Sequence, residues 1–403
     1  MNRNVCLLIL GLLAATVAMA DDSLNVRYIG GTATPGTAYG IALAGTHAYI
    51  GDCSGGLRVI DVSNPASPFE TGSWASPDYA RGLAVSGNYA YVACGYSGLR
   101  VIDVSNPASP TEVGAYGLPD YAWDVAVSGN YAYVADEDAG LHIIDITNPQ
   151  NPVLAGICDT PGNALSVVVS GDHAYVADLS GGLRVIDVSN HQNPVEAGYD
   201  VTPDLAYGIA MSGNCVYMGD YASLRIVNVS NPASPTEVGF IGTSLAVQGV
   251  SIVGNLAYFG EGSAGFRVVD VSNPASPLEV GYYNLVSGPT KVAASGPYAY
   301  CACWGNGLGI FQYYGAGVEE RPGSDQPRVT RGATIVRNVL ILGAGHDGNR
   351  PGDFGSCPRP DLLDATGRKV LDLVPGTNDV SLLAPGIYFV SGSSAVTKVL
   401  VQK

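Results

Sequence analysis

Residues 89–110, YAYVACGYSGLRVIDVSNPASP, contain the pattern from which the fold can be worked out, because most of this segment recurs along the chain. Its second tyrosine has counterparts every 42 residues, with one step of 41. These tyrosines are Tyr49, Tyr91, Tyr133, Tyr175, Tyr217, Tyr258 and Tyr300. The polar position of Ile-Asp-Val follows the same period, at Asp61, Asp103, Asp145, Asp187, Asn228, Asp270 and Gln312. The chain therefore contains seven copies of one unit.

Each of the first six copies divides into four short runs of strand length. In the third copy these runs are residues 123–128, 131–136, 141–146 and 152–157, with turn-forming Gly, Asn, Asp and Pro residues between them. Short runs rich in β-branched residues indicate strands, because helices need longer segments with a 3.6-residue pattern. A period near 42 residues with four strands is typical of a propeller blade. We therefore predict an all-β fold in which residues 21–315 form a seven-bladed β-propeller.

The two ends of the repeat region predict how the ring closes. The seventh copy ends near Tyr314 without a fourth strand, whereas an unpaired strand-like segment, residues 25–30, precedes the first copy. We therefore predict that this N-terminal strand completes the last blade. Such pairing removes an exposed sheet edge, as closed β architectures require.

A family resemblance rests on the segment LRVID at residues 57–61 and on its copies, which begin at Leu99, Leu141, Leu183 and Leu224. These segments resemble the LVIVD repeat of bacterial surface proteins predicted to be propellers. The resemblance covers residues 24–315. It implies a β-propeller on an exported protein, and it supplies no catalytic residues.

The N-terminal residues predict export. A weakly basic start, an apolar run at residues 5–17 and the small-x-small sequence Ala18-Met19-Ala20 form the pattern of a cleaved signal peptide over residues 1–20. The apolar run is shorter than the roughly 20 residues that span a bilayer. No second run of this kind follows. We therefore expect an extracellular or outer-surface protein with no transmembrane segment once the signal is removed.

The sequence after the propeller predicts a linker and a second, smaller domain. Residues 316–334 lose the repeat and have the composition of a linker, and residues 335–403 contain short runs that predict a small C-terminal β-sandwich. Three blocks, at residues 363–370, 385–390 and 398–403, resemble the C-terminal sorting domain of type IX secretion cargo. This resemblance implies the secretion machinery as a partner. The alternative is a sandwich that only caps or docks on the propeller.

Composition and charge exclude one class of function. Only 13% of the 403 residues are charged, and residues 21–315 carry 26 acidic but only 8 basic side chains. A groove for nucleic acid needs clustered positive charge, so we expect no nucleic-acid partner.

Of the eight cysteines, Cys6 leaves with the signal. We expect the other seven to be small buried apolar residues, with their pairing left open.

The most variable position of the repeat opens the innermost strand of each blade. It holds Tyr39, Arg81, Trp123, Leu165, Tyr207, Gln248 and Thr290, and the next position holds Asp124 and Lys291 where the other copies have Gly or Ser. Innermost strands line the channel of a propeller, so we expect these residues to meet at one mouth. Aromatic faces beside polar groups can bind a glycan or a peptide. The predicted ligand-binding residues are Tyr39, Arg81, Trp123, Asp124, Tyr207, Gln248 and Lys291. The alternative is that they only plug the channel.

A second repeated position lies three residues after each repeat tyrosine. Five copies have a carboxylate there, namely Asp52, Asp136, Asp178, Asp220 and Glu261. An arginine recurs across the hairpin in most copies and predicts a structural ion pair. The alternative is a Ca²⁺ site, because Ca²⁺ prefers oxygen ligands, although no copy has the spacing of a calcium loop. We therefore expect no cofactor and no metal other than this alternative Ca²⁺.

We expect a monomeric binding or interaction module rather than an enzyme. The five histidines do not align with the channel mouth, and no Gly-x-Ser-x-Gly motif occurs. A carboxylate pair such as Asp124 with Asp136 could supply an acid and a base. A hydrolase or lyase of extracellular polymers is therefore an alternative, as is a structural component of a surface coat.

Overall fold

The computed structural model describes residues 23–285 and 288–315 and, farther along, the backbone of seven strands between residues 333 and 401. The chain divides into two units, with the boundary between Tyr313 and Tyr314. The predicted signal peptide, residues 1–20, lies outside the described residues. In the part that is described, no helix has both the length and the apolar character needed to cross a membrane.

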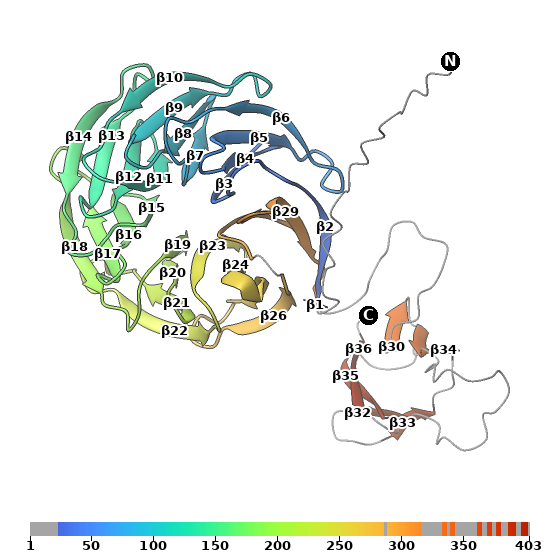
Figure 1. Cartoon of the computed structure of the whole chain (residues 1–403). Coiled ribbons are helices and arrows are strands. Elements are labelled where there is room, and N and C mark those ends of the chain that lie inside the picture. The colour runs from blue at the N-terminus through green and yellow to red at the C-terminus, as the bar shows by residue number, and fades with distance from the viewer. Residues whose placement is uncertain are drawn as a thin grey trace, which may run out of the picture. The chain divides into compact units, whose positions relative to one another are not determined.

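The first unit is a ring of seven antiparallel sheets, the β-propeller that the repeat predicts (Figure 1). In blades 1 to 6 the four strands of the repeat follow the chain from the innermost to the outermost. Blade 1 contains β3 (Gly40–Ala44), β4 (His47–Gly51), β5 (Leu57–Asp61) and β6 (Phe69–Trp74). Blade 2 contains β7 (Leu83–Ser86), β8 (Tyr89–Ala93), β9 (Leu99–Asp103) and β10 (Thr111–Tyr116). Blade 3 contains β11 (Ala122–Ser128), β12 (Tyr131–Asp136), β13 (Leu141–Asp145) and β14 (Val153–Cys158).

The remaining blades repeat this order. Blade 4 contains β15 (Ser166–Ser170), β16 (His173–Ala177), β17 (Leu183–Asp187) and β18 (Val195–Asp200). Blade 5 contains β19 (Gly208–Ser212), β20 (Cys215–Gly219), β21 (Ser223–Asn228) and β22 (Thr236–Gly242). Blade 6 contains β23 (Val247–Val253), β24 (Leu256–Glu261), the 3-10 turn η1 (Gly262–Ala264), β25 (Phe266–Asp270) and β26 (Leu278–Tyr283). Blade 7 begins with β27 (Lys291–Ser295), β28 (Tyr298–Cys303) and β29 (Gly307–Tyr313).

The N-terminal strand closes the ring, as predicted. Strand β2 (Val26–Thr32) pairs antiparallel with β29 and forms the outermost strand of blade 7. The short strand β1 (Ser23–Leu24), which the sequence did not predict, pairs with β26 at the outer edge of blade 6. Asn25 lies between them in a left-handed conformation, and its side-chain amide donates a 2.8 Å hydrogen bond to the carbonyl of Val280. The N-terminal segment therefore joins the last two blades.

The hydrophobic core consists of layers between neighbouring blades. In the layer between blades 1 and 2, for example, Tyr49, Leu57 and Val59 pack against Val92 and Ile102. Layers of the same kind lie between the other pairs of blades, including blades 6 and 7 and blades 7 and 1. Because each blade buries its faces only against its neighbours, the core depends on an unbroken ring.

A glycine in the outermost strand determines how closely neighbouring blades approach. A Cβ atom at Gly72 would clash with the carbonyl of Pro107, which lies in the Ser-Asn-Pro-Ala-Ser-Pro turn of the next blade. This repeated hexapeptide therefore packs directly on the preceding blade. At Gly281 of blade 6 no such turn packs on the strand, because blade 7 lacks the hexapeptide. A Cβ there would instead come within 3.0 Å of Leu24 and Val26 of the N-terminal segment.

The second unit is described by its strands. Strands β30 (Ala333–Val336), β31 (Val339–Leu342) and β34 (Gly376–Asp379) form one sheet. Strands β33 (Lys369–Asp372), β32 (Asp361–Asp364), β35 (Gly386–Ser391) and β36 (Val396–Val401) form the other. Strand β30 begins inside the predicted linker, residues 316–334. The β-sandwich and the sorting domain stay predictions.

Candidate functional site

The loops at one end of the ring are tied to one another, and the predicted ligand-binding residues lie at this end. In each of the first four blades, the loop between the second and third strands forms a β-bridge with a residue at or just before the start of the next blade's innermost strand. The bridges join Cys53 to Ala80, Gly95 to Ala122, Glu137 to Ala164 and Leu179 to Ala206. The first residues of the innermost strands are therefore held beside these loops.

Arg81 lies at the centre of a group of aromatic rings that come from blades 1 to 3. Its guanidinium carbon lies 4.1 Å from the ring centre of Trp123 and 4.7 Å from that of Tyr39. The ring of Tyr121 is 5.2 Å away, and its hydroxyl accepts a 2.8 Å hydrogen bond from Nε of Arg81. The ring of Tyr79 is 6.0 Å away. A cation at these distances from ring faces is attracted by them.

The rings also contact one another and form one continuous surface. The ring of Tyr121 lies 5.1 Å from Trp123 and 5.0 Å from Tyr96, centre to centre. Tyr39 lies 6.0 Å from Trp123. Tyr121 is buried, whereas Tyr79 and Tyr96 are 48% and 71% exposed. We call the following six residues the aromatic cluster: Tyr39, Tyr79, Arg81, Tyr96, Tyr121 and Trp123.

The aromatic cluster combines one positive charge with neutral rings. Burial raises the pKa of Tyr39 to about 12, although the positive charge of Arg81 opposes the rise. Burial also raises the pKa of Tyr121. Both phenols therefore keep their protons at neutral pH. The indole Nε1 of Trp123 is buried without an acceptor.

Asp124 and Lys291, two of the predicted ligand-binding residues, bind each other. Nζ of Lys291 in β27 lies 2.6 Å from Oδ2 of Asp124 in β11 and 3.1 Å from Oγ of Ser166 in β15. The hydroxyl of Ser166 donates a 2.6 Å hydrogen bond to the same carboxylate oxygen. This ion pair joins blade 7 to blades 3 and 4 on the other side of the ring, so it spans the channel. For Asp124 and Lys291 the geometry favours closure of the channel over a free contact with a ligand. We call Asp124, Ser166 and Lys291 the plug.

Glycines in the adjoining blades make room for this plug. A Cβ atom at Gly82 would come 2.6 Å from Cα of Asp124, and one at Gly249 would come 2.8 Å from Cα of Lys291. Both distances are too short for a side chain. Gly82 and Gly249 occupy the same position of the repeat as Asp124 and Lys291, each one blade earlier, so the absence of a side chain there has a packing reason.

The other residues at this position of the repeat lie apart from both groups. Within the described chain, Tyr207 and Gln248 form no hydrogen bond or ring contact with the aromatic cluster or the plug. Burial raises the pKa of Tyr207, and nearby Tyr221 adds to the rise. Thr290 is buried, and its hydroxyl donates to the carbonyl of Tyr39 at 2.8 Å, which joins blade 7 to blade 1. The residues predicted to meet at one mouth therefore fall into three groups. These are the aromatic cluster, the plug, and Tyr207 with Gln248, which contact neither.

The second repeated position holds buried carboxylates that pair within their own blades. Arg58 lies 3.6 Å from Asp52, Arg184 lies 3.5 Å from Asp178 and Arg267 lies 2.7 Å from Glu261. The predicted arginine partners are therefore present. The carboxylates lie in separate blades, and among the described residues no group of three or more His, Cys, Asp or Glu could hold a metal ion. The geometry thus favours the structural interpretation over the Ca²⁺ alternative.

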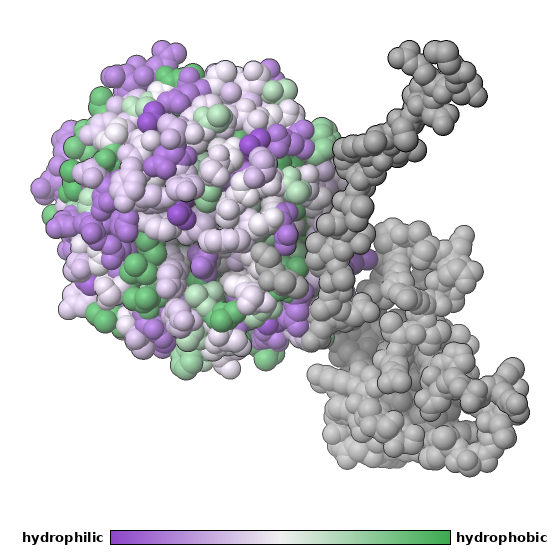
Figure 2. All heavy atoms as spheres, in the orientation of Figure 1, coloured by the Kyte–Doolittle hydropathy of each residue, from purple (hydrophilic) through white to green (hydrophobic). Residues whose placement is uncertain are grey.

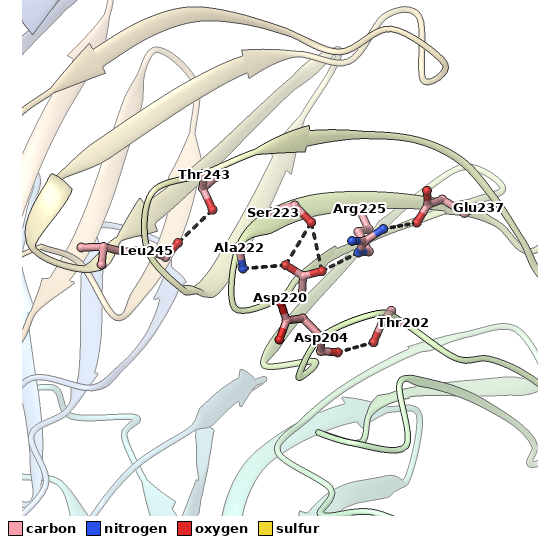
Figure 3. A network of polar contacts seen from close by, with 9 residues as sticks. All are labelled: Thr202, Asp204, Asp220, Ala222, Ser223, Arg225, Glu237, Thr243 and Leu245. Atoms are coloured by element: carbon pink, nitrogen blue, oxygen red, sulfur yellow. Dashed lines mark hydrogen bonds and ion pairs between the residues drawn. The ribbon is translucent and has the colours of Figure 1, made fainter.

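Figure 3 shows this arrangement in blade 5. Asp220 follows β20 and accepts hydrogen bonds from the amide of Ala222 at 2.8 Å and from the hydroxyl of Ser223 at 2.9 Å. Nε of Arg225 in β21 donates to the same carboxylate, and its Nη1 lies 2.6 Å from Glu237 in β22. The network links the second, third and fourth strands of the blade.

Blade 3 departs from this pattern. His142 stands where five of the other blades have arginine, and Nδ1 of His142 lies 3.4 Å from Oδ2 of Asp136. Neither carboxylate oxygen of Asp136 has a hydrogen-bond partner, whereas in blade 4 Thr160 donates to Asp178 at 2.6 Å. Burial raises the pKa of Asp136 to about 7 and lowers that of His142 to about 4. Between these values the pair is a neutral acid beside a neutral imidazole.

We expect Asp136→Asn and His142→Gln to change the pH dependence of stability in opposite directions. The folded pKa of Asp136, about 7, lies above its ordinary 3.8, so this carboxyl destabilises the fold as pH rises from 4 to 7. The folded pKa of His142, about 4, lies below its ordinary 6.5, so this imidazole destabilises the fold as pH falls from 6.5 to 4. In the native protein the two effects oppose each other between pH 4 and 6.5.

Urea unfolding at about pH 4.5, 5.5 and 6.5 measures the effect. The free energy of unfolding should fall with rising pH in His142→Gln and rise with pH in Asp136→Asn, by up to about 1.4 kcal/mol per pH unit relative to the native chain. If the free energy of unfolding changes with pH in the same direction in both variants, the pair does not titrate in this way.

Two further features of the sequence have clear places in the structure. Asp124 and Asp136, the carboxylates considered as an acid and a base, have separate partners, the first in the plug and the second beside His142. The six described cysteines are unpaired, and four of them are buried. Those six are Cys53, Cys94, Cys158, Cys215, Cys301 and Cys303. Cys357 lies outside the described residues.

Sequence reasoning missed three members of the aromatic cluster, Tyr79, Tyr96 and Tyr121, and it missed Ser166 of the plug. A signal for two of them exists. The tetrapeptide Pro-Asp-Tyr-Ala occurs at residues 77–80 and again at 119–122, before the innermost strands of blades 2 and 3 alone. An alignment of these connecting segments would have placed both tyrosines next to Arg81 and Trp123.

These features define a seven-bladed β-propeller with an aromatic and basic cluster at one end of its channel. The profile of the LVIVD repeat matches most of the propeller, at residues 35–76, 77–117, 119–160, 161–201, 205–243, 246–285 and 289–311. The chain therefore belongs to the LVIVD repeat family.

Solved structures with the same fold are distant in sequence. The structure of U3-55K and the crystal structure of the RRP9 WD40 repeats each match with a TM-score of 0.59 and 10% identity, over 71% of this chain and 98% and 97% of theirs. The computationally designed Ika8 protein matches with a TM-score of 0.54 and 11% identity, over 71% of this chain and 99% of its own. At such identities the likeness shows the fold alone. No curated protein matches the chain.

Proposed function

We propose that the protein is an exported binding module that recognises a glycan or a peptide non-covalently at the aromatic cluster. The observation that carries the proposal is Arg81, which four rings surround at 4.1 to 6.0 Å. Exposed ring faces can stack on a ligand, and the guanidinium can donate several hydrogen bonds. The cluster comes from three blades that share core layers and bridges, so its side chains are held on a rigid support.

The apolar residues of one face of the propeller can be seen in Figure 2. On the face in view, hydrophobic residues form small patches separated by hydrophilic ones (Figure 2). A broad apolar interface, such as obligate partners use, needs a larger continuous area. That face therefore offers no such interface.

The proposed place of action is the extracellular space or the outer cell surface. The signal-like residues 1–20 support export, and the sorting-like blocks within residues 335–403 support the secretion machinery as a partner. The ring closes on itself through β2, which supports a monomer.

A thermal-shift screen of the full chain tests the proposal. A ligand that binds only the folded state stabilises it by about 2.7 kcal/mol at a hundred times its dissociation constant, which corresponds to a rise of at least about 3 °C. We expect such a rise with one class of oligosaccharide or peptide, and we expect Tyr96→Ala to abolish it. Tyr96 is 71% exposed, so this substitution leaves the fold intact.

Tyr221→Ala is the matched control. Tyr221 occupies the corresponding loop of blade 5, is 57% exposed and lies outside the aromatic cluster. The ligand-induced rise should persist in this variant. A rise that survives Tyr96→Ala contradicts the proposal, because the ligand would then bind outside the aromatic cluster. No rise with any ligand also contradicts it and points to a structural coat component. Consumption of the ligand would point to the hydrolase or lyase alternative.

A further inference from the structure

Arg81 and Arg27 are the two basic residues of the described propeller that form no ion pair with a carboxylate. Six basic residues form salt bridges with carboxylates there, namely Arg58, Arg100, Arg184, Arg225, Arg267 and Lys291. Arg27 donates to the side-chain oxygen of Gln312 at 2.9 and 2.6 Å. The polar partners of Arg81 are the phenols of Tyr121 and Tyr39, and both are neutral.

We propose that Arg81 is the receptor for the carboxylate of an acidic sugar, so that the ligand of the aromatic cluster is a uronic-acid glycan. This inference rests on the proposed binding function. It deepens that function by naming the charge and the class of the ligand.

The charge of the ligand follows from the surroundings of Arg81. Partial removal of a guanidinium from water without a counter-ion costs desolvation free energy, and a bound carboxylate would offset that cost. The planar fork of arginine fits a carboxylate through two parallel hydrogen bonds. The ring centres of Tyr39 and Trp123 lie 4.7 and 4.1 Å from the guanidinium carbon. Of the two basic residues without a carboxylate partner in the described propeller, only Arg81 lies among aromatic rings, so it is the better placed to accept the anion of such a ligand.

The class of the ligand follows from the backbone around the cluster. Peptides are commonly recognised through hydrogen bonds to free backbone groups. Here the amide of Arg81 donates to Ala93, the amides of Cys53 and Ala80 are paired with each other's carbonyls, and the amide of Ala122 donates to Gly95. The loops therefore offer side chains rather than a free backbone edge.

The exposed rings fit a sugar. Tyr79 and Tyr96 present half-exposed or largely exposed faces, and the apolar C–H face of a pyranose stacks on such rings. The hydroxyls of these two tyrosines form no hydrogen bond within the described chain and can bond to sugar hydroxyls. A uronic acid thus matches the cluster with its ring face, its hydroxyls and its carboxylate.

The test uses the full chain and two forms of one polymer. Oligosaccharides of polygalacturonate are compared by calorimetry with the same oligosaccharides after reduction of their carboxyl groups to alcohols. We expect the acidic form to bind at least about tenfold more tightly than the reduced form. Arg81→Gln should weaken binding of the acidic form by roughly ten- to hundredfold and leave the reduced form within about twofold. Arg100→Gln, which removes a cation already paired with Glu112, is the charge-matched control and should bind as the native chain does.

Each other outcome overturns the inference in a recognisable way. Equal binding of the acidic and reduced forms, lost in Tyr96→Ala but not in Arg81→Gln, would refute the carboxylate receptor and leave the binding function standing. Binding of an acidic peptide alone would refute the sugar. No binding of polygalacturonate, alginate, neutral glycans or peptides would refute both the inference and the proposed function. Thermal unfolding of Arg81→Gln verifies that the variant is folded.

Discussion

Deletion of residues 23–32 is expected to lower the free energy of unfolding of the propeller by roughly 5 kcal/mol or more. The deletion removes β1 and β2, and with them the outermost strand of blade 7. Val26, which is 1% exposed, leaves the layer between blades 6 and 7, and Ile29 leaves the layer between blades 7 and 1. Because domains are stable by only about 5–15 kcal/mol, this loss opens the ring.

Thermal unfolding followed by circular dichroism measures the effect. We expect the midpoint to fall by roughly 10–20 °C and aggregation to increase, because β29 becomes an unpaired edge. Deletion of residues 23 and 24 alone is the control. It removes only the two residue pairs between β1 and β26, so the midpoint should change by less than about 3 °C. A propeller that keeps its midpoint without β2 would show that the ring does not need this closure.

Replacement of Arg225 by methionine is expected to cost about 2–4 kcal/mol of stability. The carboxylate of Asp220 has no exposed surface, and Arg225→Met removes its cationic partner while Ala222 and Ser223 continue to donate to it. A buried charge without its counter-ion is strongly unfavourable, whereas methionine keeps most of the packing of the arginine stem. Urea unfolding of the full chain measures the loss.

The repeat supplies a matched control for this experiment. Arg100 occupies the same position in blade 2, where Cys94 stands in place of the buried carboxylate, and its carboxylate partner is the partly exposed Glu112. Arg100→Met should therefore cost no more than about 1 kcal/mol. Equal losses in the two variants would mean that the arginine matters only through its packing and not through the buried carboxylate.

The strands of each blade could be predicted closely, because each depends on a local alternation that occurs seven times. In the third copy the predicted runs 131–136 and 141–146 correspond to β12 (Tyr131–Asp136) and β13 (Leu141–Asp145). The outermost run, predicted at 152–157, is β14 (Val153–Cys158). Closure by the N-terminal strand was predictable for the same reason, since one strand was missing at one end of the repeat and one was in excess at the other.

The candidate site could be predicted only in part. Tyr39, Arg81 and Trp123 were selected as variable positions of an otherwise regular repeat, and they do lie together. The same selection included Asp124 and Lys291, which bind each other although they are 167 residues apart. The sequence could not distinguish a charge that is neutralised within the protein from one that is left without a counter-ion.

The number of blades, the strand boundaries and the closure of the ring follow from the amino-acid sequence, because they are set by short-range patterns and by a fixed period. The charge of Arg81 without a counter-ion, the ion pair of Asp124 and Lys291 and the neutral pair of Asp136 and His142 follow from the folded ring. Each of these depends on which side chains from different strands or blades come within hydrogen-bonding distance. Whether they do is determined by the packing of whole sheets against one another. This packing involves several repeats at once, so the sequence of one repeat does not reveal it.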